Sequence, residues 1–167
     1  MSENLYDSAI PIFNQFLKAL AALLKKSESY CAAKKIEPDA ILTARLFPDM
    51  FPLIKQVQLA CDFAKGAGAR LAGIAVPSFP DEEKTFTDLQ ARIAKTLDFL
   101  ATLKKEQFSG AATRVVTLKI GGKDTSRPGI EYLHGIVYGN FFFHLATAYN
   151  ILRHNGLEIG KRDFMGM

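Results

Sequence analysis

The sequence lacks any long apolar run. No uncharged apolar stretch approaches the roughly 20 residues that a membrane-spanning helix needs, so we expect no membrane partner. The N-terminus, MSENLYDSAI, has neither the basic start nor the apolar core of a secretory signal peptide. We therefore expect a cytoplasmic protein.

Cysteine is also scarce, with two residues in the chain. Cys31 and Cys61 lie far apart and show neither a CxxC pair nor a zinc-type spacing with histidine. In a reducing compartment we expect both to be buried thiols rather than a disulfide. Because Cys61 falls on an apolar stripe, we interpret it as an inert core residue.

The positive charge lacks a pattern, although the net charge is +4. The basic residues are scattered, and pairs such as Lys34–Lys35 are isolated, so we expect no nucleic-acid partner. The segment Gly121–Gly122–Lys123 lacks the flanking glycine and the following Ser or Thr of a phosphate-binding loop. No diagnostic catalytic motif appears elsewhere.

Helical periodicity is present instead, and it organises the segment 129–155. The residues that recur there every seven positions are Ile130, Val137, His144 and Ile151. This spacing predicts a long helix packed in a bundle. Pro128 suits the first helical position, and Gly156 suits a left-handed cap. Gly135 and Gly139 predict a close crossing by another helix.

Three further segments, about 5–29, 49–71 and 87–104, carry helical stripes. A short helical turn is expected to begin at Pro38. The tail after Gly156 has no periodicity, so we expect it to pack on the surface or to be mobile.

The ends of these helices carry their own signals. Pro11 implies either a kink in the first helix or a later start. Asp49 is expected in the first turn of the second helix, where a carboxylate complements the helix dipole. Thr87, with Gln90 three residues later, predicts a capping box on the third helix.

The pattern changes between the third helix and the last one. Residues 114–120 alternate in polarity, which predicts a short strand, and Gly121–Gly122 predicts a turn. We expect a small hairpin or an extended loop that covers one end of the bundle. Residues 1–167 are thus predicted to form a single all-α domain, a four-helix bundle with a long crossover before the last helix.

Four polar residues lie at helical spacing beside or within the apolar stripes. They are His144 and Asn140 in the last helix, and Gln58 and Asp62 in the second. Gln58 and Asp62 either face solvent, with Asp62 paired to Lys65, or border an interior pocket. His144 is a metal ligand, a general base, a polar anchor for a ligand, or a buried imidazole satisfied by a neighbouring side chain. The last reading is favoured.

The remaining polar residues of the last helix receive structural interpretations. His134 lies on a different side of the helix from His144, and His154 lies at its end. Tyr132, Tyr138 and Tyr149 are expected to pack as amphipathic residues.

Three segments carry a resemblance that covers nearly the whole chain. They are PDMFPLIKQVQLACDFAKGAGARLAG, TFTDLQARIAKTLDFL and NFFFHLATAYNILRHNG. Together they resemble an uncharacterised bacterial family within the DinB/YfiT-like four-helix-bundle superfamily. The resemblance implies a four-helix bundle, often a homodimer. Many members hold a divalent metal with three histidines, one from the second helix and an HxxxH pair on the last, and some are thiol transferases or isomerases.

The histidine pattern of the superfamily is incomplete here. His144 corresponds to the second histidine of the pair and Asn140 to the first. The second helix has no histidine, and its nearest polar residues are Gln58 and Asp62. One imidazole with amide or carboxylate oxygens is a weak donor set for zinc or nickel. No cofactor is therefore firmly expected.

Three functions are weighed on these grounds. The first is a small-molecule binding bundle, with a pocket lined by Gln58, Asp62, Asn140 and His144. The second is a metal-dependent thiol transferase that uses His144. The third is a non-enzymatic homodimer with a structural or interaction role.

Overall fold

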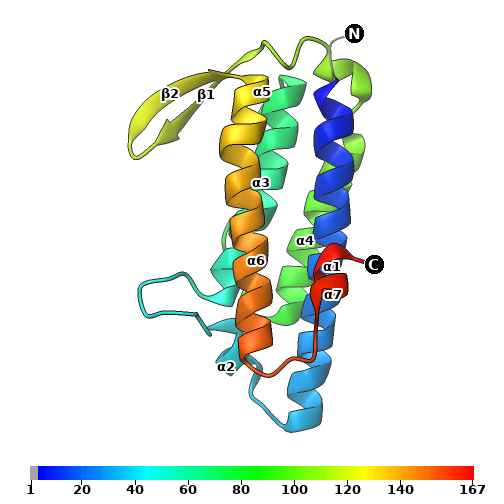
Figure 1. The fold of residues 1–167 in the computed structure, drawn as a ribbon, viewed down its shortest axis with the longest axis vertical. Helices are drawn as coiled ribbons and strands as arrows, with labels where there is room; N and C mark the ends of the chain where they lie inside the picture. Colours follow the sequence, from blue (N-terminus) through cyan, green and yellow to red (C-terminus); the bar gives the residue numbers. More distant parts are fainter. Residues whose placement is uncertain (1–3) are drawn as a thin grey trace.

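The computed structural model describes residues 4–167, in which four long helical segments run side by side (Figure 1). These segments are α1 (Leu5–Lys34), α3 (Leu53–Ala72), α4 (Phe86–Thr102) and the continuous run of α5 (Gly129–Tyr132), the π-helical turn η2 (Leu133–Val137) and α6 (Tyr138–His154). The short helices are α2 (Pro38–Leu42), the 3₁₀ turn η1 (Lys105–Phe108) and α7 (Lys161–Met165). The predicted all-α bundle is confirmed.

The crossover before the last helix contains the expected hairpin. Strands β1 (Val115–Ile120) and β2 (Lys123–Pro128) pair antiparallel, with Ile120 opposite Lys123. The two residues between them, Gly121 and Gly122, have φ values of 57° and 81°. Glycine adopts this left-handed conformation at little cost, which suits a two-residue hairpin turn. The hairpin projects from the end of the bundle beside α5 (Figure 1).

Small residues on α3 allow its neighbours to approach closely. A Cβ added at Gly68 would lie 2.8 Å from Leu103 and 2.9 Å from Leu100. The expectation of a close crossing at Gly135 and Gly139 is wrong, because an added Cβ at either position meets nothing within 4 Å. Both glycines face outward. The heptad pattern therefore predicted the buried face of the last helix correctly, but the two glycines do not serve a helix crossing.

Helix α1 begins at Leu5 and continues through Pro11. The alternative of a later start is therefore wrong. The side chain of Asn4 caps the helix by accepting a hydrogen bond from the Tyr6 backbone N–H at 3.0 Å. About one turn before Pro11, the Ser8 carbonyl accepts a hydrogen bond from the hydroxyl of Tyr138, which links α1 to the last helix.

Two other helix starts differ from the predictions. Helix α3 begins only after Pro52, so Asp49 lies in the preceding loop rather than in the first turn. Helix α4 is capped by Thr85 and Asp88, which form the capping box assigned to Thr87 and Gln90. The side chain of Gln90 instead donates to the Ala21 carbonyl of α1 at 2.8 Å, a long-range contact that local spacing does not reveal.

The last helix ends at His154, and Gly156 follows with a left-handed φ of 95°, as expected. The tail then returns along α1, where α7 packs (Figure 1). Phe164 lies against Phe16 of α1, with ring centroids 5.5 Å apart. The expectation of surface packing is confirmed. Between residues 4 and 167, no helix combines the length and apolar character that crossing a membrane requires.

Candidate functional site

His144 is a buried side chain of α6 with a partner on α3. It is 7% exposed, and its Nδ1 lies 2.8 Å from Oε1 of Gln56. Gln56 is fixed in turn because its Nε2 donates to the Phe51 carbonyl at 3.0 Å. The ring of Phe63 stacks on the imidazole, with centroids 5.8 Å apart. Burial lowers the pKa of His144, so the imidazole is neutral at pH 7.

The reading of His144 as an imidazole satisfied by a neighbouring side chain is therefore confirmed. The sequence did not identify Gln56 as a partner, because it lies beside the apolar stripe that Val57 defines and not on it. In the structure both residues are buried. The histidines outside the stripe are exposed, as interpreted: His134 stacks on Tyr138 at 5.6 Å, and His154 lies at the helix end.

A second polar cluster surrounds Arg92 of α4, whose side chain is 1% exposed. Its guanidinium donates to Asp62 and to Glu83, each at 2.9 Å, and to the Pro80 carbonyl at 3.1 Å. Asp81 lies 3.0 Å from the same guanidinium. These contacts fasten the segment 77–84 across α3 and α4. We call this the Arg92 cluster.

Two of the predicted site residues belong to the Arg92 cluster. Gln58 is buried and donates to Glu83 at 2.8 Å. Asp62 forms an ion pair with Lys65 at 2.8 Å, as one of the alternatives predicted, and also accepts a hydrogen bond from Arg92. Arg92 itself was missed because it lies outside the apolar stripe of α4, and its carboxylate partners come from a loop with no periodicity.

The Arg92 cluster lowers the pKa of two carboxylates, Glu83 and Asp81. Burial alone raises the pKa of Glu83, but hydrogen bonds from Arg92 and Gln58 outweigh it, so the pKa lies below its ordinary value. Asp81 behaves alike, with burial opposed by Lys55 and Arg92. Both groups are therefore ionised at neutral pH, which suits a structural ion cluster.

A cleft of about 600 Å³ lies between α3 and the last helix, bordered by the hairpin. Its lining residues are Leu59, Asp62, Phe63, Arg70, Leu118, Lys119, Gly121, Tyr132, Ile136 and Asn140. The structure thus brings Asp62 and Asn140 to one cleft, while Gln58 and His144 are engaged elsewhere. We call this space the α3–α6 cleft.

Arg70 and Tyr132 form the polar wall of the α3–α6 cleft. Nη1 of Arg70 donates to the hydroxyl of Tyr132 at 3.2 Å. Burial raises the pKa of Tyr132, and the neighbouring Arg70 offsets part of that shift, so the hydroxyl stays protonated. Asn140 lies on the α6 side, where its amide donates to the Ile136 carbonyl at 2.7 Å.

The residues that correspond to the superfamily's metal ligands do not fit a metal. Nδ1 of His144 bonds to Gln56, and the amide of Asn140 donates to a backbone carbonyl. The carboxylate of Asp62 is held by two cations. Within residues 4–167 there is no group of three or more His, Cys, Asp or Glu side chains placed to hold a metal ion.

Both cysteines are buried free thiols, as expected. Burial raises the pKa of Cys61 to about 12, an effect that a hydrogen bond with Thr96 only partly opposes. Burial also raises the pKa of Cys31. A thiol nucleophile needs a lowered pKa and access to solvent, so neither residue has the environment of a reactive cysteine.

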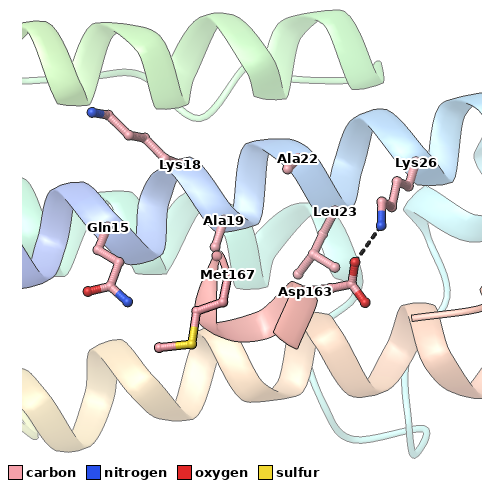
Figure 2. A pocket seen from close by; sticks show the side chains of 9 residues that line it. Gln15, Lys18, Ala19, Ala22, Leu23, Lys26, Asp163 and Met167 are labelled. Carbon is pink, nitrogen blue, oxygen red and sulfur yellow. Dashed lines mark hydrogen bonds and ion pairs between the residues drawn. The ribbon is translucent and has the colours of Figure 1, made fainter. Parts of the chain in front are cut away.

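A second hollow, of about 400 Å³, lies between α1 and the C-terminal segment. Figure 2 shows that Lys18 points away from α7 and that Lys26 pairs with Asp163. Its lining is completed by short or apolar side chains such as Ala19, Leu23 and Met167. Because Lys26 is already paired with Asp163, this hollow offers fewer polar groups to a ligand than the α3–α6 cleft does.

The helical order and the crossover hairpin define a DinB-like helical bundle. A solved structure described as that of a DinB family member protein from Shewanella denitrificans superimposes with a TM-score of 0.89. That chain is 40% identical in sequence, and the match covers 98% of this chain and 92% of the other. Residues 5–165 match the model described as Domain of unknown function (DUF1993), and the chain belongs to this family. A search of the curated proteins finds no match.

Proposed function

We propose that this protein binds a small organic molecule in the α3–α6 cleft. The observation that carries the proposal is the cleft itself, a space of about 600 Å³ with both apolar and polar walls. Small-molecule sites are typically about 300–1,000 Å³, mostly apolar, with a few polar groups that fix the orientation of the ligand. The α3–α6 cleft has this size and this composition.

Neighbouring side chains hold the polar groups of the cleft in place through hydrogen bonds and ion pairs. Arg70 is oriented by Tyr132, and Asp62 is held by Lys65 and Arg92. Such prior fixing reduces the entropy that binding would otherwise cost. The arrangement supports recognition of a ligand, and it assigns no reaction to the site.

The proposal is tested by filling the cleft. Leu59 lines the cleft and is half-buried, so Leu59→Trp adds volume there. The matched control is Ala22→Trp in the hollow between α1 and the C-terminal segment, where Ala22 is exposed. Both variants are compared with wild type in ¹H–¹⁵N correlation spectra recorded with a library of small organic fragments.

We expect fragments to shift amide signals of α3 and the last helix in wild type and in Ala22→Trp, but not in Leu59→Trp. Retained dispersion of the spectra shows that each variant is folded. Fragment binding that Leu59→Trp leaves intact, or that Ala22→Trp abolishes, contradicts the proposal.

We also propose that a second copy of the chain covers the outer face of α6. Phe143 is 55% exposed on the same side of the helix as the open glycines Gly135 and Gly139. Phenylalanine is enriched at the centre of protein–protein interfaces, and glycines on the same helix face let a partner approach the backbone closely. Light scattering after gel filtration tests the proposal: we expect a dimer in wild type and a monomer in Phe143→Glu. A wild-type monomer at micromolar concentration refutes it.

A further inference from the structure

We infer that the ligand of the α3–α6 cleft is a small organic anion whose carboxylate or phosphate group is bound by Arg70. The inference rests on the proposed binding function and names the chemical class of the ligand. It is carried by the charge, the partners and the position of the Arg70 guanidinium.

Arg70 has no carboxylate partner among residues 4–167. Its only hydrogen bond there goes to the neutral hydroxyl of Tyr132, and none of the ion pairs of the described chain includes it. Arg92 is the opposite case, with three carboxylates around one guanidinium. A guanidinium matches a carboxylate or phosphate in a planar, two-bond geometry. Arg70 therefore lines the cleft with a charge that no carboxylate of residues 4–167 neutralises.

The other charges of the cleft favour the same ligand class. Lys119 adds a second cation to the lining, and its only ion-pair partner within the described chain is Asp124, 3.9 Å away in an exposed pair that solvent screens. The one carboxylate there, Asp62, already accepts a hydrogen bond from Arg92 and forms an ion pair with Lys65, both through Oδ1. Its negative charge is thus compensated from behind, and the cleft presents a net positive wall. The apolar residues Leu59 and Phe63 are placed to contact the organic part of the ligand.

Gly66 gives the Arg70 guanidinium its position. Side chains on a helix lean toward its N-terminus, so Arg70 extends back over the preceding turn of α3. A Cβ added at Gly66 would lie 2.5 Å from Nη1 of Arg70. The absence of a side chain at this buried position therefore leaves the space that the guanidinium occupies. We assign Gly66 as a positioning residue for anion binding.

The experiment uses matched probes that differ in charge. Phenylacetate, benzoate and indole-3-acetate are each compared with the corresponding primary amide by ¹H–¹⁵N titration of the full-length chain. We expect each carboxylate to bind at least about tenfold more tightly than its amide, because hydrogen bonds between charged groups are the stronger ones. The shifted signals should belong to α3 and to the last helix.

Three variants separate the role of Arg70 from general stability. Arg70→Gln should remove the preference for carboxylates while retaining amide binding. Gly66→Ala keeps Arg70 and improves helix propensity, and the atom that the new methyl group would meet, Nη1 of Arg70, ends a flexible side chain. This variant should therefore fold. It should still lose most of the preference for carboxylates, because the guanidinium is displaced. Tyr132→Phe should lose part of it. If Arg70 has only a structural role, Gly66→Ala should bind carboxylates as tightly as the wild type does.

The outcomes distinguish the two proposals. Amides that bind the cleft as tightly as carboxylates overturn the assignment of an anion and leave the proposed binding function standing. A carboxylate preference that persists in Arg70→Gln also overturns it. If neither member of any pair shifts signals around the cleft, the anion inference and the proposed function both fail.

Discussion

The Arg92 cluster offers the sharpest test of the energetics of this fold. Arg92→Met removes a guanidinium that is 1% exposed but retains an apolar stem of similar length. The cost depends on what the three carboxylates keep. Asp62 retains Lys65, and Asp81 retains Lys55. Glu83, whose side chain is 13% exposed, retains two neutral donors, the amide of Gln58 and its own backbone N–H.

The loss therefore falls mainly on one partly buried carboxylate and on the Pro80 carbonyl. Breaking a buried charge pair costs about 3–5 kcal/mol, and partial exposure of the carboxylates reduces that amount. We expect Arg92→Met to lower the free energy of unfolding by about 3 kcal/mol, which for a chain of this size lowers the melting temperature by roughly 6–12 °C. Urea denaturation followed by circular dichroism measures the difference.

The matched control is Arg127→Met. Arg127 is exposed, and it lies 3.6 Å from Glu131 in a surface ion pair. We expect a change within about 0.5 kcal/mol, because exposed ion pairs contribute little. A loss for Arg92→Met no larger than that of this control refutes the reasoning.

The effect should also depend on pH with a defined sign. Because the folded-state pKa of Glu83 lies below its ordinary value of 4.5, the stability it contributes is present above about pH 4.5 and is lost as the pH falls through the folded-state pKa. The gap between wild type and Arg92→Met should therefore narrow from pH 7 to pH 4. An equal gap at both pH values contradicts the electrostatic explanation.

Three further predictions concern buried groups. Because burial holds the pKa of His144 below 6.5, the free energy of unfolding of the wild type should fall as the pH drops below about 6.5, and His144→Leu should lose this dependence. The variant also leaves the side-chain oxygen of Gln56 unpaired, which should cost about 1–3 kcal/mol by urea denaturation. A variant whose stability depends on pH as strongly as that of the wild type refutes this explanation. Neither Cys31 nor Cys61 should react with a disulfide reagent at pH 8 until the protein is unfolded, when both should react, and fast labelling of native protein contradicts their burial. Gly156→Ala should cost more than about 1 kcal/mol because φ there is 95°, and an unchanged unfolding midpoint excludes that strain.

Much of the fold could be predicted because it depends on local patterns. Heptad spacing located four helices, alternation located β1, and the paired glycines located the hairpin turn. The start of α4 was predicted two residues too late, because Thr87 and Gln90 have capping-box spacing and only the bond from Gln90 to α1 shows that they do not form one. Local spacing cannot distinguish such alternatives, because the deciding contact lies far away in the sequence.

The candidate site could be predicted only in part for the same reason. Helical spacing indicated that Asp62, Asn140 and His144 lie on or beside the bundle seam, but not which partners they meet. The Arg92 cluster depends on Asp81 and Glu83, which lie in an aperiodic loop. No local pattern distinguishes Arg70, because the space over Gly66 that its guanidinium occupies is visible only in three dimensions.

The most direct test of the central claim is a crystallographic fragment screen of the wild-type protein. We expect bound fragments in the α3–α6 cleft, between Leu59 and Ile136, with their polar groups toward Arg70. Fragments that bind only the hollow between α1 and the C-terminal segment, or a cleft that stays empty across the library, would contradict the claim that this cleft is the binding site.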